Sequence, residues 1–166
     1  MEITSHRYKP DTVVCILNEA DIASDPSLAA HFEKTHASLL RGPNGLEIIY
    51  VDGRLPELQH GPGYRPEVLD VMIAHELGHM YYGPQHGAQP NRPYEEREAD
   101  DVAWVVLSTH GDAAAICLHE REYEARWGYR LECFDNPSGD TDGWPHSRRQ
   151  PAEITQWCKQ IAGMVE

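Results

Sequence analysis

The chain has no long apolar run and carries few positive charges. Nowhere in its 166 residues do 18 apolar residues follow one another, so no membrane-spanning helix is predicted. The N-terminal residues MEITSHRYKP include no apolar stretch of the kind that a secretory signal carries, and we expect a cytoplasmic protein. Lys and Arg number 14 against 27 Asp and Glu, which gives a formal net charge of −13 at pH 7. Because nucleic-acid affinity depends largely on Lys and Arg, we expect neither a nucleic acid nor a membrane as a partner.

Cysteine is also scarce. Four cysteines occur without any C-x-x-C pair, and they are widely spaced: Cys15, Cys117, Cys133 and Cys158. In a cytosolic protein such residues are expected to be free, mostly buried thiols rather than disulfides or metal ligands. The length and the composition, 40% hydrophobic and 25% charged, are typical of one globular domain, which we expect to cover residues 1–166.

What the chain does contain is the pentapeptide His-Glu-Leu-Gly-His at residues 75–79. Residues four apart on a helix lie on one face, so the rings of His75 and His79 could bind a single zinc ion. Glu76 lies beside them, where its carboxylate could take a proton from the attacking water as a general base. The composition alone would produce this pattern in roughly one shuffled sequence in twenty, so the surrounding sequence has to decide.

The pentapeptide falls in a predicted helix over residues 66–82. Pro66 suits a first helical position, and Gly83-Pro84 end the helix. Gly78 costs such a helix about 1 kcal/mol relative to alanine, which indicates that another backbone approaches closely there. The core face of the helix is marked by residues at i, i+4 and i+7: Ile73, Leu77 and Met80.

A catalytic zinc site needs three protein ligands and an open position, so a third ligand must lie elsewhere. A second helix, predicted over residues 94–108, carries Glu96 and Asp100 one turn apart. Glu96 would bind the metal, and Asp100 would accept the ring N–H of a ligating histidine and fix its tautomer. Ala99 and Ala103 are small enough to let the two helices pack closely.

His86 is a second candidate for the third ligand. The string HELGHMYYGPQH nearly reproduces the metzincin pattern H-E-x-x-H-x-x-G-x-x-H, but it is one residue longer. The methionine turn of metzincins is also missing, because no Met occurs between Met80 and Met164. The residues therefore favour Glu96 and leave His86 open.

HELGH followed by a helix that carries EREAD resembles the gluzincin metallopeptidases. It is most similar to the minigluzincins, the CAAX-protease/HtpX-like peptidases and the ImmA/IrrE family, which share the pattern HExxH…ExxA(D/N). The resemblance covers roughly residues 25–108 and implies a zincin-like domain. It implies that one catalytic zinc ion is held by His75, His79 and Glu96, with Glu76 as the general base and Asp100 as the supporting acid.

The C-terminal segment DGWPHSRRQPAEI loosely resembles the H-P…R-I segment of HtpX-like catalytic domains. By this likeness His146 would be a further catalytic residue, and Arg148 would lie near it. Pro145 and His146 stand in the reverse order, however, so the role of both residues depends on a weak match.

The other segments predict an α+β fold, mainly helical, with a small mixed sheet beside the active-site helix. Residues 46–51 (LEIIYV) are the clearest strand, whereas residues 12–17 (TVVCIL) fit either a buried strand or the start of a helix. A helix is expected over residues 25–40, because Asp25 suits an N-cap. Four residues at helical spacing would form a stripe on one face of this helix: Leu28, Phe32, Thr35 and Leu39.

Two more helices are expected in the second half of the chain. One covers residues 112–127, with the charged run HEREYEAR on a solvated face. The other covers residues 151–165 and is amphipathic, and residues 135–147 between them are expected to be a loop.

These observations predict a zinc-dependent endopeptidase that hydrolyses a specific, intracellular protein or peptide substrate. The substrate would lie extended against the strand at residues 46–51, as at a sheet edge. The donor that stabilises the developing oxyanion is left open among six residues: Tyr64, Tyr81, Tyr82, His86, His146 and Arg148. The alternative is a non-catalytic binding or regulatory module that keeps the metallopeptidase fold, and the presence of Glu76 favours the enzyme.

Overall fold

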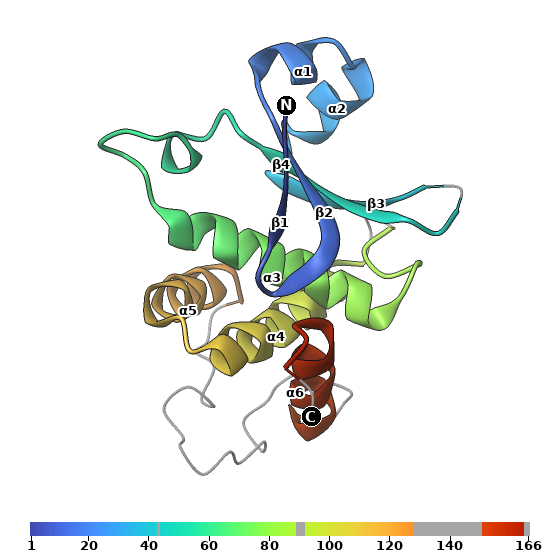
Figure 1. The fold of residues 1–166 in the computed structure, drawn as a ribbon, viewed down its shortest axis with the longest axis vertical. Coiled ribbons are helices and arrows are strands. Elements are labelled where there is room, and N and C mark those ends of the chain that lie inside the picture. Colours follow the sequence, from blue (N-terminus) through green and yellow to red (C-terminus); the bar gives the residue numbers. More distant parts are fainter. Residues whose placement is uncertain (43, 89–91, 128–150, 165–166) are drawn as a thin grey trace.

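A mixed four-stranded sheet forms the N-terminal part of the chain (Figure 1). The structure is a computed structural model, and it describes residues 1–42, 44–88, 92–127 and 151–164. The strands lie in the order β1-β2-β4-β3, where β2 and β4 are parallel and the two outer pairs are antiparallel. Their bounds are Glu2–His6 for β1, Lys9–Leu17 for β2, Ala37–Arg41 for β3 and Glu47–Asp52 for β4.

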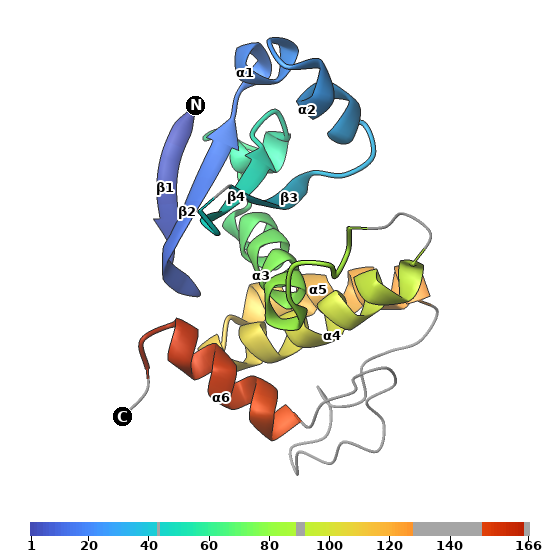
Figure 2. The same cartoon turned by 90° about the vertical axis from the view of Figure 1, so that its right-hand side faces the viewer.

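The helices pack below this sheet, except for two short ones that lie above it in Figure 1. Those two are α1 (Glu19–Ala23) and α2 (Pro26–His31), and a 3₁₀ turn, η1, covers Pro56–Leu58. The larger helices are α3 (Pro66–Tyr82), α4 (Pro93–His110), α5 (Ala113–Trp127) and α6 (Pro151–Ile161). Figure 2 shows α3 between the sheet and α4, and both α5 and α6 pack against α4. The expected α+β class with a small mixed sheet is confirmed.

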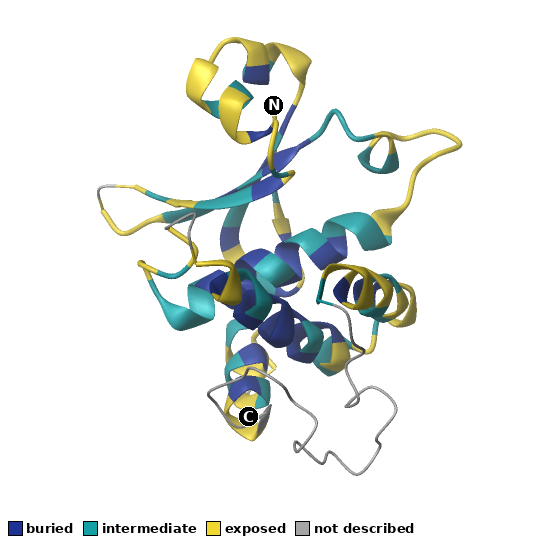
Figure 3. Ribbon diagram, turned by 180° about the vertical axis from the view of Figure 1, so that it is seen from behind, coloured by how far each residue is buried: buried dark blue, intermediate teal, exposed yellow. Residues whose placement is uncertain are grey.

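The two faces of the sheet are buried by different helices, as the alternation of side chains along its strands dictates. Val14 of β2 and Ile49 and Val51 of β4 belong to the main core, which α3, α4 and α6 complete. Their neighbours on the opposite face, Cys15 and Leu17, form a smaller core with α1 and α2. Figure 3 shows the buried residues concentrated where α3 meets α4 and the sheet.

The close approach expected at Gly78 is present between α3 and α4. A Cβ atom added to Gly78 would lie 2.7 Å from Cα of Ala99, so the two backbones touch with no room for a methyl group. Ala99 and Ala103 are both completely buried in this interface. The small residues therefore let α3 and α4 approach closely. Polar side chains at neighbouring positions on the two helices then lie within reach of one another.

The expected helix over residues 25–40 is wrong beyond its first turns. Asp25 caps a helix as predicted, its side chain accepting from the backbone N–H of Ser27 and Leu28, but α2 ends at His31. Residues 37–41 instead form β3, paired with β4 across a short connection. Leu39, which we placed on a helical stripe, packs against the main core from the strand. Pairing with β4 outweighs the local helical pattern, because it satisfies backbone groups along a whole strand.

The remaining element predictions fare better. The strand at residues 46–51 and the helices at 66–82, 94–108, 112–127 and 151–165 are confirmed with shifts of at most a few residues at their ends. Residues 12–17 belong to a strand, β2. The run HEREYEAR is not a purely solvated face, however, since His119 and Tyr123 within it are buried against α4. The loop expected at residues 135–147 and Val165 lie outside the described residues.

Membrane and cysteine predictions can be compared with the described part of the chain. No helix there is long and apolar enough to cross a membrane. Cys15 and Cys158 are buried free thiols, as expected, whereas Cys117 is free but exposed. Cys133 lies outside the described residues.

Candidate metal centre

Three side chains from α3 and α4 converge on one point. Nε2 of His75 lies 3.1 Å from Nε2 of His79 and 3.1 Å from a carboxylate oxygen of Glu96. The other oxygen of Glu96 is 3.2 Å from Nε2 of His79. The three groups could hold a metal ion, since each offers one ligand atom to a common position. The sequence predicted this trio, and the helical spacing of the two histidines accounts for their half of it.

Asp100 holds the ring of His75 from behind. Its Oδ1 accepts the Nδ1–H of His75 at 2.6 Å, so that Nε2 of His75 is directed toward the cluster. Its Oδ2 accepts two further N–H groups from α5, one from Arg126 at 3.0 Å and one from Trp127 at 2.8 Å. The predicted supporting role of Asp100 in orienting His75 matches these contacts, and the two partners on α5 were not predicted.

The charges of these groups depend on one another. Burial alone would lower the pKa of His75, but Asp100 and Glu96 outweigh it and hold that pKa well above its ordinary value. Burial would raise the pKa of Glu96, but hydrogen bonds with His75 and His79 outweigh it and lower that pKa far below its usual range. Glu96 is therefore an anion beside the Nε2 atoms of His75 and His79. A positive charge among these three groups stabilises the arrangement. A proton or a metal ion can supply that positive charge.

His86, the rival third ligand, does not join the cluster. Its Nδ1 contacts Nδ1 of His79 at 2.9 Å, on the side of the ring opposite to Nε2. Its other nitrogen lies 3.2 Å from a carboxylate oxygen of Glu98. Burial lowers the pKa of His86, which favours the neutral ring. His86 thus lies behind a candidate ligand, and it is not among the three residues whose ligand atoms converge.

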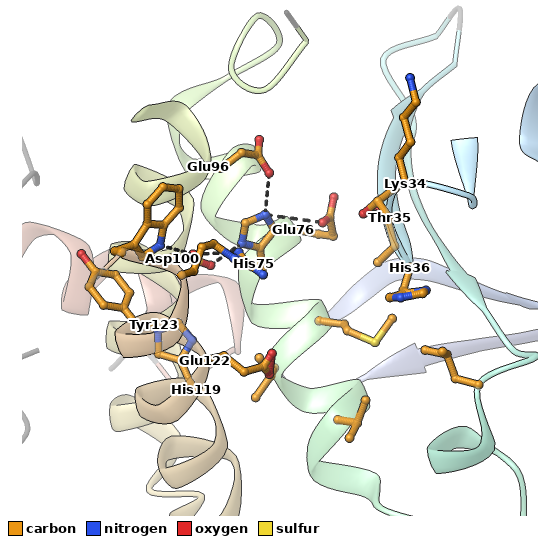
Figure 4. A pocket seen from close by; sticks show the side chains of 17 residues that line it. Lys34, Thr35, His36, His75, Glu76, Glu96, Asp100, His119, Glu122 and Tyr123 are labelled. Carbon is orange, nitrogen blue, oxygen red and sulfur yellow. Dashed lines mark hydrogen bonds and ion pairs between the residues drawn. The ribbon is translucent and has the colours of Figure 1, made fainter. Parts of the chain in front are cut away.

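A cleft of about 500 Å³ opens beside the cluster. His75, Glu76 and Glu96 form one wall, and Figure 4 shows Lys34, Thr35 and His36 on the opposite side. Another part of the lining is apolar and consists of Leu55, Val68, Val71 and Met72. The cleft therefore combines polar groups, beside which a peptide group could lie, with an apolar region that fits a side chain.

Glu76 lies on the wall of this cleft next to the cluster. Its carboxylate is 4.0 Å from Nε2 of His75, and its side chain is largely buried. Glu76 and Glu96 both line the cleft, so a group bound there beside the cluster would lie next to Glu76. The predicted place of Glu76, adjacent to the ligands but not among them, matches this geometry.

Other predicted site residues lie elsewhere. Of the oxyanion candidates, His146 and Arg148 are outside the described residues. The four described ones, Tyr64, Tyr81, Tyr82 and His86, do not line the cleft. Described residues with N–H or O–H groups that do line it come from α5 and from the segment before β3, and they include Thr35, His36 and Tyr123.

The strand expected to bind substrate is also misplaced. Residues 46–51 form β4, which pairs with β2 on one side and with β3 on the other, so neither of its edges is free. The edge strands are β1 and β3, and the segment that leads into β3 lines the cleft. The sequence analysis did not predict the edge strand β3, because most of its residues fall in the helix expected over residues 25–40.

Comparisons of the chain with protein-family models, with curated proteins and with solved structures give no match. The role of the site therefore has to be argued from its geometry and chemistry.

Proposed function

We propose that this chain is a zinc-dependent peptidase with a zincin-like catalytic domain. The observation that carries the proposal is the convergence of His75, His79 and Glu96 on one point, with Glu76 beside that point on the wall of a cleft. Two imidazoles and one carboxylate form the donor set of many hydrolytic zinc sites. The gluzincin resemblance of HELGH and EREAD supports the same assignment.

The residues present fit a zinc ion. Tetrahedral zinc with bonds of roughly 2.0–2.1 Å separates its ligand atoms by about 3.3 Å. The three ligand-atom separations here are 3.1, 3.1 and 3.2 Å. Glu96 is 44% exposed, so the cluster is open to the cleft and a fourth position is accessible. When bound, a zinc ion would polarise the substrate carbonyl and lower the pKa of a water molecule to about 7.

The chain's own residues account for the proton transfers. Glu76 would take a proton from the attacking water, since its carboxylate is on the cleft wall and 4.0 Å from Nε2 of His75. It then returns this proton to the nitrogen of the leaving amine. Asp100 keeps Nδ1 of His75 protonated throughout, so the ring cannot turn away from the cluster.

The substrate is a protein or peptide segment in extended form. It would lie along β3, the edge strand, and enter the cleft near Thr35 and His36. One side chain next to the cleaved bond would enter the region lined by Val71 and Met72, which favours an apolar residue there. The substrate would thus pair with β3 and not with β4, while its extended form stays as predicted.

Cleavage of a peptide mixture tests the proposal. Zinc-loaded protein is incubated with a mixture of synthetic 14-residue peptides, and new termini are identified by mass spectrometry. Glu76→Gln should retain bound zinc and lower the rate by about 10²–10⁴-fold, because it loses the general base. The matched control is Glu67→Gln, which changes a partly buried glutamate in the first turn of α3 that does not line the cleft, and it should cleave like wild type.

Cleavage at equal rates by wild type and Glu76→Gln would contradict the proposed mechanism. Wild-type protein that binds zinc and cleaves no peptide would instead be the non-catalytic binding module.

A further inference from the structure

His79 has a second set of contacts, on the side of its ring that faces away from the cluster. Its Nδ1 lies 2.9 Å from Nδ1 of His86, and Nε2 of His86 lies 3.2 Å from a carboxylate oxygen of Glu98. The side chains of His86 and Glu98 are only 6% and 4% exposed, so little water competes for these contacts. The three residues form a chain of hydrogen bonds that leads from a buried carboxylate to the metal centre.

The protons in this chain have one consistent arrangement if His79 binds a metal through Nε2. Nδ1 of His79 then carries the ring proton and donates it to Nδ1 of His86. Nδ1 of His86 is an acceptor in that bond, so its own ring proton is on Nε2. There it is donated to Glu98. Every donor in the chain faces an acceptor.

The loop after α3 is shaped around the ring of His79. Gly83 and Gly87 have φ angles of 108° and 79°, a region that favours glycine. A Cβ atom added to Gly87 would lie 2.6 Å from ring atoms of His79, so the loop backbone lies directly against the imidazole. His86 is stacked on Tyr82, with ring centroids 4.4 Å apart and an angle of 20° between the planes. The position of His86 is therefore fixed from two sides.

The two histidines of the cluster are supported in parallel ways. His75 donates directly to Asp100, whereas His79 reaches the carboxylate of Glu98 through the ring of His86. A carboxylate behind a ligating histidine fixes its tautomer and raises its basicity. The extra imidazole extends this arrangement by one residue.

We propose that His86 and Glu98 are positioning residues of the metal centre, holding the ring of His79 so that Nε2 faces the metal. This inference rests on the proposed metal centre, but it does not depend on peptide hydrolysis. It also explains the near-match to the metzincin pattern: with one residue more in the loop, His86 lies behind His79 and not beside it.

The test is zinc affinity, measured by competition with a chromophoric chelator. His86→Phe keeps a ring over Tyr82 but has no acceptor for His79, and its dissociation constant for zinc should rise by about 10–100-fold. His86→Asn restores an acceptor oxygen close to the position of Nδ1 and should recover most of this loss. The visible spectrum of the cobalt-substituted protein should change in His86→Phe and resemble wild type in His86→Asn.

A control variant separates positioning from stability. His6 is a similarly buried histidine, paired with Asp70 near the start of α3, with 2.7 Å between Nε2 and the carboxylate. His6→Phe should lower the melting temperature of the metal-free protein and leave zinc affinity within about threefold of wild type, because sites without shared partners act independently.

A double-mutant cycle tests whether Glu98 acts through His86. Glu98→Gln alone should weaken zinc binding less than His86→Phe, because the amide oxygen still accepts a hydrogen bond. The double variant should bind zinc as His86→Phe does. This arm also keeps the inference testable if His86→Phe does not fold, since Glu98→Gln changes polar atoms at nearly constant volume.

Wild-type affinity in folded His86→Phe, or additive losses in the double variant, would overturn the inference. Equal losses in His86→Phe and His86→Asn would also do so. Failure of peptide cleavage with these zinc affinities intact would affect only the proposed function.

Discussion

Asp100 and Asp101 are neighbours in the chain, yet their carboxyl groups have opposite properties. Burial would raise the pKa of Asp100, but His75 and Arg126 hold it at about 2. Burial raises the pKa of Asp101 to about 7 with help from the nearby charge of Asp100, and this outweighs the hydrogen bond from Tyr123, which lowers that pKa. Two consecutive residues of α4 therefore differ: Asp100 is an anion beside the candidate metal centre, whereas Asp101 is protonated in mildly acidic solution.

Asp101 should make stability depend on pH. The pKa of Asp101 is about 7 in the folded protein, whereas 3.8 is the ordinary value for Asp and applies to the unfolded chain. The unfolded chain therefore loses this proton first as the pH rises. Stability is then full below about pH 4 and falls toward pH 7, by at most about 1.4 kcal/mol per pH unit. Asp101→Asn cannot ionise but still accepts from Tyr123, so its melting temperature relative to wild type should rise between pH 5 and pH 8.

The comparison is made on metal-free protein, to keep zinc affinity out of the measurement. A difference in melting temperature that is the same at pH 5 and at pH 8 would show that Asp101 does not titrate in this window.

At the scale of elements, the contact of α3 with α4 determines the site, because each helix supplies part of it. His75 and His79 come from α3 and Glu96 from α4, and the contact between Gly78 and Ala99 lies between them. Any change in the distance between the helices therefore changes the distance between the ligands. The edge strand β3 is the second element on which the proposed function would depend, since the segment before it lines the cleft.

Gly78→Ala should destabilise the protein, although alanine is the better helix former by about 1 kcal/mol. The added methyl group would lie 2.7 Å from Cα of Ala99, and crowding of this kind costs typically about 1–3 kcal/mol. We expect a lower melting temperature and weaker zinc binding. Gly61→Ala is the control, because a Cβ at Gly61 meets nothing within 4 Å and should leave both quantities near wild type. A more stable Gly78→Ala variant would contradict the close packing.

Leu39→Pro should impair peptide cleavage and leave the sheet intact. The N–H of Asp52 donates to the carbonyl of His36, and the N–H of Gly42 donates to that of Leu46, so the N–H of Leu39, at the alternate position, points away from β4. Proline removes this N–H from the edge available to substrate. Leu39→Ala loses the side chain and keeps the N–H. We expect a higher KM for peptide substrate in Leu39→Pro than in Leu39→Ala. Equal KM values would argue against substrate binding along β3.

At the scale of the whole molecule, the sheet is tied to the helices by ion pairs at one end. Arg7, in the turn between β1 and β2, contacts Asp70 of α3 and Asp112, which precedes α5. His6 and Tyr8 bind the same two carboxylates. Burial would raise the pKa of Asp70, but His6 and Arg7 outweigh it and lower that pKa. These contacts fix α3 relative to the sheet, and thereby the cleft relative to β3.

Local signals in the sequence were enough to predict α3 and most of the site. Pro66 and Gly83 limit the helix, and the spacing of its histidines places both rings on one face. The strand β3 could not be predicted, because it depends on pairing with β4 and its own residues fit a helical stripe. To choose between Glu96 and His86 as the third ligand, one must know which ring nitrogen of His79 each of them approaches. Local sequence patterns do not contain this information.

The metal content of the purified protein tests the central claim most directly. Wild type, His75→Ala, Glu96→Ala and His86→Phe are dialysed against one excess of zinc, and bound zinc is measured by atomic absorption. We expect one zinc ion per wild-type chain and loss of bound zinc in His75→Ala and Glu96→Ala. His86→Phe should still bind zinc at saturation, because His86 lies outside the proposed ligand set. Wild type without zinc, or Glu96→Ala with undiminished affinity while His86→Phe has lost its zinc, would contradict it.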